Sequence, residues 1–132
     1  MLVENVMTRA EGLVKISPMS TVRDALKLMK ENDVRSVIVE KTVNSGAYGL
    51  LTFKNLLQSI VAEDGDIDLL NVYDIAVMPA FSVSGKLDIQ YAAKMMVNSS
   101  IKRLLVIDNN ELIGILTMSD IIEVLMESVD AL

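Results

Sequence analysis

"GLLTFKN" at residues 49–55 and "GILTMSD" at residues 114–120 decide the fold of this chain. Each stretch begins as an apolar, strand-like run after a glycine and continues into residues that favour the start of a helix. Thr117 suits the N-cap of that helix, and Asp120 stands three residues later, where it can complete a capping box. The two stretches therefore predict two copies of one strand-to-helix unit.

The similarity between the two copies extends along the whole chain. In chain order, the further matched segments are "NVMT" at 5–8 with "AVMP" at 76–79, "DALKLM" at 24–29 with "YAAKMM" at 91–96, and "DVRSVIV" at 33–39 with "SIKRLLV" at 100–106. Their order never changes, and their offset drifts only across polar or small-residue stretches, where loops tolerate insertions. The sequence thus predicts a tandem duplication, roughly 1–64 and 70–132, joined by an acidic linker at 65–69.

The hydrophobic periodicity predicts the order β-α-β-β-α within each copy. Apolar residues recur at helical spacing over 21–32, with Thr21 as the N-cap and Asp24 three residues later. The other elements expected in the first copy are the strands "LVKIS" at 13–17, "RSVIVE" at 35–40 and "AYGLLTF" at 47–53, and the amphipathic helix "NLLQSIVAE" at 55–63. In the second copy, residues 108–111 should form a tighter hairpin turn, because Asn and Asp tolerate left-handed backbone. The predicted fold is α+β, with the two copies packed by pseudo-twofold symmetry.

Composition excludes several classes of function. The chain has 132 residues, 52% of them apolar, with no cysteine and no histidine. Disulfides, thiol nucleophiles and the commonest general base and metal ligand are therefore absent, so we expect neither an enzyme nor a metal site. The acidic "EDGDID" at 63–68 lacks the spaced ligands of a calcium loop and reads as a solvated linker.

The charge and hydropathy of the chain limit its partners and location. The net charge of −6 argues against a duplex nucleic acid as partner. No apolar run has the length of a membrane-spanning helix, and the N-terminus lacks a signal-peptide pattern. We therefore expect no membrane insertion and a cytoplasmic location.

The repeat resembles a tandem CBS-domain pair, also called a Bateman module. The resemblance covers essentially the whole chain and rests on its openings "VMT" and "VMP", on "ISP", on "RLLVID", and on the doubled motif described above. It implies a regulatory protein that binds an adenosine-containing ligand (AMP, ADP, ATP, S-adenosylmethionine or a dinucleotide) in clefts between the repeats. It also implies a homodimer in the form of a flat disk and a regulated partner protein, which the sequence does not identify. The alternative is a CBS pair that acts only as a dimerisation or interaction scaffold and binds no nucleotide.

For Thr117 and Asp120, local sequence and resemblance point to different roles. The local sequence favours the capping box, in which both side chains only stabilise the helix. The resemblance implies that Asp120 binds ribose, and an ionised carboxylate can accept from both hydroxyls of a ribose diol. Thr117 can serve both purposes.

The equivalent pair in the first copy is Thr52 and Asn55, which the resemblance also places at a ribose. An amide has one acceptor oxygen and no charge, so it should hold a diol less strongly than Asp120 does. The sequence therefore predicts two unequal sites, with the stronger one at Asp120.

Basic residues near the strands are candidates for phosphate contacts. Lys102 and Arg103 are an adjacent basic pair, and the resemblance implies that they bind phosphate; the matching position in the first copy is Arg35. The alternative is a solvated strand edge carrying positive charge. For the adenine, the resemblance points to the backbone at Ile16 and Val83, although both residues also suit an ordinary core strand.

Overall fold

The computed structural model describes residues 1–42 and 46–131, which belong to two compact units. Unit 1 comprises Met1–Leu13 together with Phe81–Leu132, and unit 2 comprises Val14–Ala80. Each unit has its own buried apolar cluster, so each is a separate packing unit.

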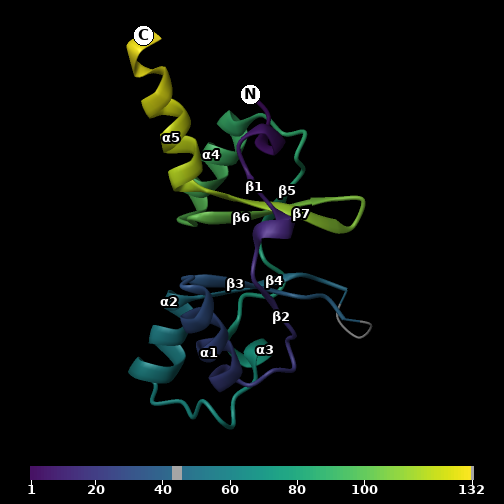
Figure 1. Cartoon of the computed structure of the whole chain (residues 1–132), viewed down its shortest axis with the longest axis vertical. Helices are drawn as coiled ribbons and strands as arrows, with labels where there is room; N and C mark the ends of the chain where they lie inside the picture. The colour runs from purple at the N-terminus through teal and green to yellow at the C-terminus, as the bar shows by residue number, and fades with distance from the viewer. Residues whose placement is uncertain (43–45, 132) are drawn as a thin grey trace. The chain divides into compact units, whose positions relative to one another are not determined.

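Unit 2 is a three-stranded sheet with helices on one face (Figure 1). Its elements are β2 (Lys15–Ile16), α1 (Val22–Asn32), β3 (Ser36–Val39), β4 (Gly49–Thr52), α2 (Phe53–Leu56), the π-helical turn η3 (Leu57–Ala62) and α3 (Val72–Ile75). The sheet order is β2-β3-β4, with β2 parallel to β3 and β3 antiparallel to β4. The predicted β-α-β-β-α order is confirmed, and the last helix continues through π-helical geometry.

Helix α1 begins where its capping residues predict. Thr21 Oγ1 accepts from the Asp24 backbone N–H at 3.1 Å, and Asp24 Oδ2 accepts from the Thr21 N–H at 3.4 Å. These bonds satisfy donors that the first helical turn would otherwise leave unpaired. The helix ends at Asp33, which is left-handed with φ of 51°, and its apolar stripe is buried in the core of unit 2.

Unit 1 repeats this plan and adds one strand. Its elements are η1 (Val3–Asn5), β1 (Thr8–Arg9), η2 (Ala10–Gly12), β5 (Ser82–Val83), α4 (Ile89–Ser99), β6 (Arg103–Asp108), β7 (Glu111–Thr117), α5 (Met118–Ser128) and η4 (Val129–Ala131). The sheet order is β1-β7-β6-β5, with α4 and α5 on one face (Figure 1). The tight turn predicted between β6 and β7 is confirmed, because Asn109 and Asn110 both have positive φ and Asp108 pairs with Glu111.

The compact units differ from the two sequence repeats, because the first residues of each repeat pack with the body of the other. Strand β1 pairs with β7, with Arg9 opposite Gly114. In unit 2, Val77 forms a bridge to Leu50, next to Gly49. These two glycines are the first residues of the two stretches that define the repeat. A Cβ atom on Gly114 would lie 2.5 Å from Thr8 O, so the close approach of the paired β1 segment requires glycine there.

The acidic stretch predicted as a solvated linker is bound to helix α1. The carbonyls of Ile67 and Leu70 accept from the first two backbone N–H groups of α1, and both side chains pack against the core of unit 2. Arg23 Nη2 donates to Asp68 Oδ2 at 2.9 Å, and Arg23 Nε donates to Asp68 Oδ1. The linker is therefore packed against the N-terminus of α1. The acidic composition of the linker did not predict this packing.

The ion pair between Arg23 and Asp68 predicts a pH-dependent contribution to stability. The hydrogen bond from Arg23 holds the pKa of Asp68 below its ordinary value of 3.8. When the pKa of a carboxyl group is lower in the folded state than in the unfolded state, the group stabilises the fold at pH values above its unfolded-state pKa. This stabilisation is lost as the pH falls through the folded-state pKa. We therefore expect Asp68→Asn to lower the free energy of unfolding at neutral pH and to match the wild type once Asp68 is protonated. Urea unfolding of both proteins across this range measures the difference, and a difference that persists in acid would contradict the assignment.

Candidate functional site

In unit 1, four of the predicted site residues lie at one end of the β6–β7 hairpin. Arg103 is directly opposite Thr117 in the antiparallel ladder, so their side chains share a face of the sheet. The Met118 N–H, at the start of α5, donates to the Lys102 carbonyl at 3.0 Å. Asp120 follows within the first turn of α5. The fold thus brings one carboxylate, one hydroxyl and two cations to the same hairpin end.

The capping box at this end is formed, and it leaves Asp120 with spare hydrogen-bonding capacity. Asp120 Oδ2 accepts from the Thr117 N–H at 2.8 Å, and Thr117 Oγ1 accepts from the Asp120 N–H at 3.2 Å. Both residues are half-buried. Asp120 Oδ1 has no hydrogen-bond partner among the described residues. The capping bonds therefore fix the carboxylate in place while one oxygen remains available to a ligand.

The two cations are not used within the described part of the chain. Neither Lys102 nor Arg103 forms an ion pair with any residue in 1–42 or 46–131. Lys102 is exposed and Arg103 is half-buried. Guanidinium groups bind phosphate in a bidentate manner, and ammonium groups act as point charges, so each residue can contact an anion at this hairpin end.

The equivalent hairpin end of unit 2 has the same backbone arrangement and different chemistry. Ser36 lies opposite Thr52, and the Phe53 N–H donates to the Arg35 carbonyl at 3.2 Å. Asn55 Oδ1 accepts from both the Thr52 N–H at 2.9 Å and the Thr52 hydroxyl at 3.1 Å. A backbone N–H can only donate, so the amide oxygen must face it, and both of its lone pairs are then used.

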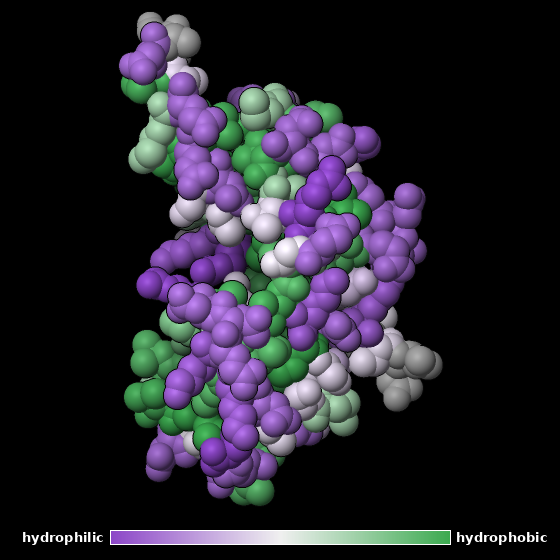
Figure 2. Space-filling model, viewed as in Figure 1, coloured by the Kyte–Doolittle hydropathy of each residue, from purple (hydrophilic) through white to green (hydrophobic). Residues whose placement is uncertain are grey.

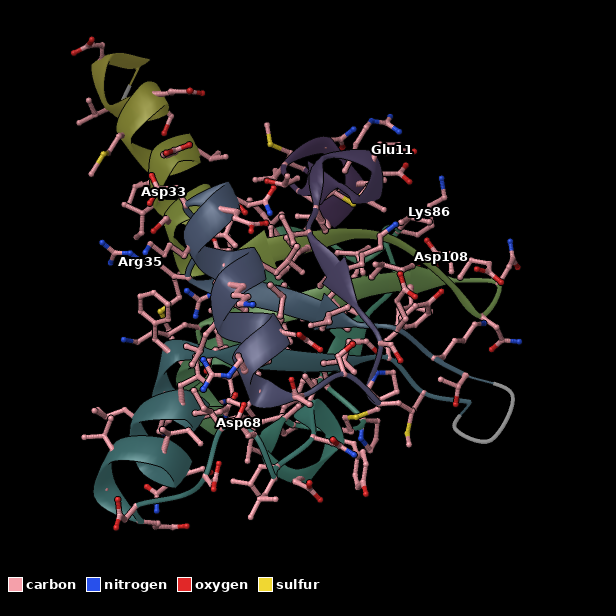
Figure 3. The ribbon with its side chains drawn as sticks, turned by 60° about the horizontal axis from the view of Figure 1, so that its bottom comes forward. Glu11, Asp33, Arg35, Asp68, Lys86 and Asp108 are labelled. Atoms are coloured by element: carbon pink, nitrogen blue, oxygen red, sulfur yellow. The ribbon has the colours of Figure 1, made fainter. Side chains whose placement is uncertain are left out.

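Asn55 and Asp120 therefore differ more in their free hydrogen-bond acceptors than the sequence predicted. Asn55 has only the N–H donors of its Nδ2 left for a ligand, whereas Asp120 has a free, charged acceptor oxygen. One exposed cation, Arg35, follows helix α1 in unit 2 (Figure 3), in place of the adjacent pair in unit 1.

The two residues predicted near the adenine lie in edge strands, with buried side chains. Ile16 is in β2 and Val83 is in β5, and the two side chains belong to the cores of unit 2 and unit 1 respectively. The Ile16 carbonyl accepts from the Glu40 N–H at 2.9 Å. Any contact with a base would therefore come from the exposed backbone edge of these strands, and the adenine role of both residues stays a prediction.

A second polar cluster in unit 1, which the sequence did not single out, holds the loop between β5 and α4. Asp108 accepts from the Ser84 hydroxyl at 2.7 Å and from the Gly85 N–H at 3.1 Å. Lys86 donates to Glu4 Oε1 at 2.9 Å, and this bond raises the pKa of Lys86 (Figure 3). All of these groups satisfy one another, so the cluster explains the local fold. Its sequence signal was the Asp that ends "RLLVID".

Two structural features bear on metal binding and membrane insertion: a group of metal-ligating side chains and a helix of membrane-spanning character. Within 1–42 and 46–131, no group of three or more acidic side chains is arranged to hold a metal ion. In the same residues, no helix has the length and apolar character needed to cross a bilayer.

Comparison with known proteins assigns both sequence repeats to one family. The family model described as "CBS domain" matches twice, at residues 3–62 and 72–127. An uncharacterized protein, MK0525, from Methanopyrus kandleri is 31% identical over 109 residues. The alignment covers 82% of this chain and 55% of that protein, so this chain spans about half the length of that relative.

Solved structures of CBS proteins share the fold. The hexameric CBS-CP12 protein from bloom-forming cyanobacteria has a TM-score of 0.82 and 33% identity, over 92% of this chain and 69% of that chain. The CBS domain protein PAE2072 from Pyrobaculum aerophilum, solved in complex with AMP, has a TM-score of 0.80 and 20% identity. That alignment covers 96% of this chain and 97% of the other, and it bears on the fold alone.

Proposed function

Because the chain belongs to the CBS-domain family, whose members are regulatory modules rather than catalysts, we propose that it is an adenine-nucleotide sensor. It binds AMP, ADP or ATP and uses the bound state to control a partner protein. The observation that supports this most is the hairpin end of unit 1, where Asp120 and the pair Lys102 and Arg103 offer an acceptor for a diol beside donors for a phosphate. A nucleoside phosphate carries both groups. The Pyrobaculum protein, whose fold this chain shares, was solved in complex with AMP, so the fold can accommodate a ligand of this class.

Within this proposal, the two units bind unequally. The free carboxylate oxygen of Asp120 accepts from the ribose hydroxyls, while Arg103 and Lys102 contact the phosphate. In unit 2, Asn55 has no free acceptor and one cation stands in place of two, so the site of unit 2 binds more weakly. Ile16 and Val83 contribute backbone near the base.

We also propose that the chain associates with itself. The cyanobacterial relative is hexameric, and large apolar side chains are exposed on α2 and α5 of this chain; both facts support the proposal. A scaffold that associates without binding nucleotide is the competing function, and S-adenosylmethionine or a dinucleotide are the competing ligands.

Thermal unfolding with added ligand separates these possibilities. Purified chain is heated with millimolar AMP, ADP, ATP, NAD or S-adenosylmethionine. A ligand that binds the folded state and is present at 100 times its dissociation constant stabilises that state by about 2.7 kcal/mol. We expect an adenine mononucleotide to give the largest rise in melting temperature. Unchanged melting with every ligand would favour the scaffold and overturn the sensor.

A further inference from the structure

Residues 18–22 and 69–73 of unit 2 run antiparallel beside each other, just before α1 and α3. Thr21 and Asn71 form the bridge between the two segments. The valine that follows each bridged residue is fully buried in the core of unit 2. The two segments are therefore fixed to each other and to the core, so the side chains that they expose keep a defined arrangement.

Three large apolar side chains are exposed on these segments. Met19, Leu69 and Tyr73 are 65%, 79% and 48% exposed. The Tyr73 N–H donates to the carbonyl of Pro18 at 3.0 Å, which brings Tyr73 next to the residue that precedes Met19. We call the surface formed by Met19, Leu69 and Tyr73 the Met19–Tyr73 face. Large apolar side chains that are exposed together mark an interaction surface.

Unit 1 has the same backbone arrangement, with an ion pair at the equivalent positions. A bridge of the same kind joins the corresponding segments, and the Glu4 N–H donates to the Gly85 carbonyl at 3.0 Å. Lys86 Nζ donates to Glu4 Oε1 at 2.9 Å. Glu4 thus stands in the place of Tyr73, and Lys86 in the place of Met19. Because this arrangement accepts a charged pair at these positions, the local fold of unit 2 does not explain its exposed apolar pair.

The charge around the Met19–Tyr73 face is negative. The Asp66 carbonyl accepts from the Leu69 N–H at 3.2 Å, and Asp74 directly follows Tyr73. Neither Asp66 nor Asp74 forms an ion pair within the part of the chain that the structure describes. The sequence has no lysine or arginine between positions 55 and 85. The carboxylates beside this face are therefore not neutralised by neighbouring cations of the same segment.

The cation in the first turn of α1 does not change the sign of this charge. Arg23 donates to both carboxylate oxygens of Asp68, so these two charges compensate each other. Figure 2 shows the lower end of unit 2, where η3 is connected to α3, as largely hydrophilic with hydrophobic residues among the hydrophilic ones. Such a surface is complemented by a partner that is both apolar and basic.

We propose that the Met19–Tyr73 face binds the regulated partner, through a segment of that partner in which lysines or arginines flank apolar side chains. The apolar side chains of the segment cover Met19, Leu69 and Tyr73, while its cations face Asp66 and Asp74. Contact between two copies of this face is disfavoured, since it would bring carboxylates together. The inference rests on the proposed function, because it names the surface through which the sensor contacts its partner.

Defined peptides test the chemistry of this face. A short, fluorescently labelled peptide of alternating lysine and leucine is added to the full chain without nucleotide, and its anisotropy is measured. We expect saturable binding, and binding weaker by about tenfold or more when glutamate replaces the lysines or serine replaces the leucines. No binding of the lysine–leucine peptide would overturn the proposal. Equal binding of the lysine–serine peptide would also overturn it, because net charge alone would then explain the attraction.

A variant that transfers the ion pair of unit 1 to unit 2 tests the location. Met19→Lys with Tyr73→Glu leaves the net charge of the chain unchanged. We expect the double variant to keep its circular dichroism spectrum and to bind the lysine–leucine peptide about tenfold or more weakly. Leu69→Ser, at a side chain that is 79% exposed, gives the same test at a position that the core does not use. Unchanged binding in both variants would overturn the proposal.

Neutralising the two carboxylates tests the charge. Asp66→Asn with Asp74→Asn keeps an oxygen that can accept from the backbone N–H groups of Asp68 and Asn71, and it removes both charges. We expect this variant to bind the lysine–leucine peptide more weakly than the wild type. Equal binding would overturn the role of these carboxylates.

A matched control and a nucleotide titration complete the test. Glu11→Gln with Asp130→Asn makes the same change in net charge at exposed positions of unit 1, and we expect it to bind the peptide as the wild type does. A loss as large as that in the variant of unit 2 would overturn the proposal. The rise in melting temperature with AMP is measured on the same proteins. A rise with AMP but no peptide binding overturns this face alone, and peptide binding without any rise overturns the sensor and leaves this face as a docking surface.

Discussion

Asp120→Asn is expected to weaken AMP binding about 10- to 100-fold with little loss of stability. Asparagine keeps an oxygen that can accept from the Thr117 N–H, so the helix cap survives. It loses the charge and the second acceptor, and a hydrogen bond to a charged group contributes about 1.5–3 kcal/mol. Since about 1.4 kcal/mol corresponds to a factor of ten in affinity, the expected loss follows. Isothermal titration with AMP measures it.

Two matched variants separate ligand binding from helix capping. Asp24→Asn changes an equivalent capping box, Thr21–Asp24, at the start of α1, where no site residue is proposed, and should leave AMP affinity unchanged. Asn55→Ala removes the weaker unit 2 pair and should cost less affinity than Asp120→Asn. Equal losses in Asp120→Asn and Asp24→Asn would assign Asp120 to capping alone, and a larger loss in Asn55→Ala would reverse the ranking of the two sites.

Gly114→Ala is expected to destabilise the fold by about 1–3 kcal/mol, the range for inserting a methyl group into a closely packed site. Its Cβ atom would lie 2.5 Å from Thr8 O and 2.7 Å from Met7 Sδ, both in the segment that pairs with β7 or directly precedes it. Neither the backbone of β7 nor that of β1 can move without breaking their pairing. Urea unfolding gives the change in the free energy of unfolding.

Gly12→Ala is the control for this substitution. A Cβ atom on Gly12 meets nothing within 4 Å, so this variant should be close to wild type in stability. Gly49→Ala should behave like Gly114→Ala, because its Cβ atom would lie 2.9 Å from Val77 O. If Gly114→Ala were as stable as Gly12→Ala, the close approach of the β1 segment to β7 would be refuted.

The sequence predicted the helices, strands and turns well because each of them depends on residues that are close together in the chain. The capping boxes at Thr21 and Thr117 mark helix starts that the structure confirms, and the Asn109–Asn110 turn is local too. The family and the α+β class followed from the register of the repeat, in which two weak motifs reinforced each other.

The exchange of N-terminal segments was missed, because a repeat in the sequence does not say which copy its first residues pack against. Gly49 and Gly114 carried a signal, since a glycine within a strand often marks the close approach of another backbone. The docking of Ile67 and Leu70 was missed because the surrounding aspartates dominated the composition of that stretch.

The sequence predicted which residues form the candidate site, but it did not predict their hydrogen-bond geometry. The sequence ranked Asp120 above Asn55 by charge alone. The stronger reason is tertiary: both lone pairs of Asn55 Oδ1 are occupied by Thr52, whereas Asp120 has one oxygen free. Only the three-dimensional structure shows which acceptor atoms of a capping side chain already accept a hydrogen bond.

Amide NMR of the full chain during titration with AMP tests the proposed site most directly. We predict saturable shifts at Lys102, Arg103 and 117–120, with smaller shifts at 52–55 at the same AMP concentration. No shift in either group, or larger shifts at 52–55 than at 117–120, would contradict the assignment of nucleotide binding to the Asp120 site.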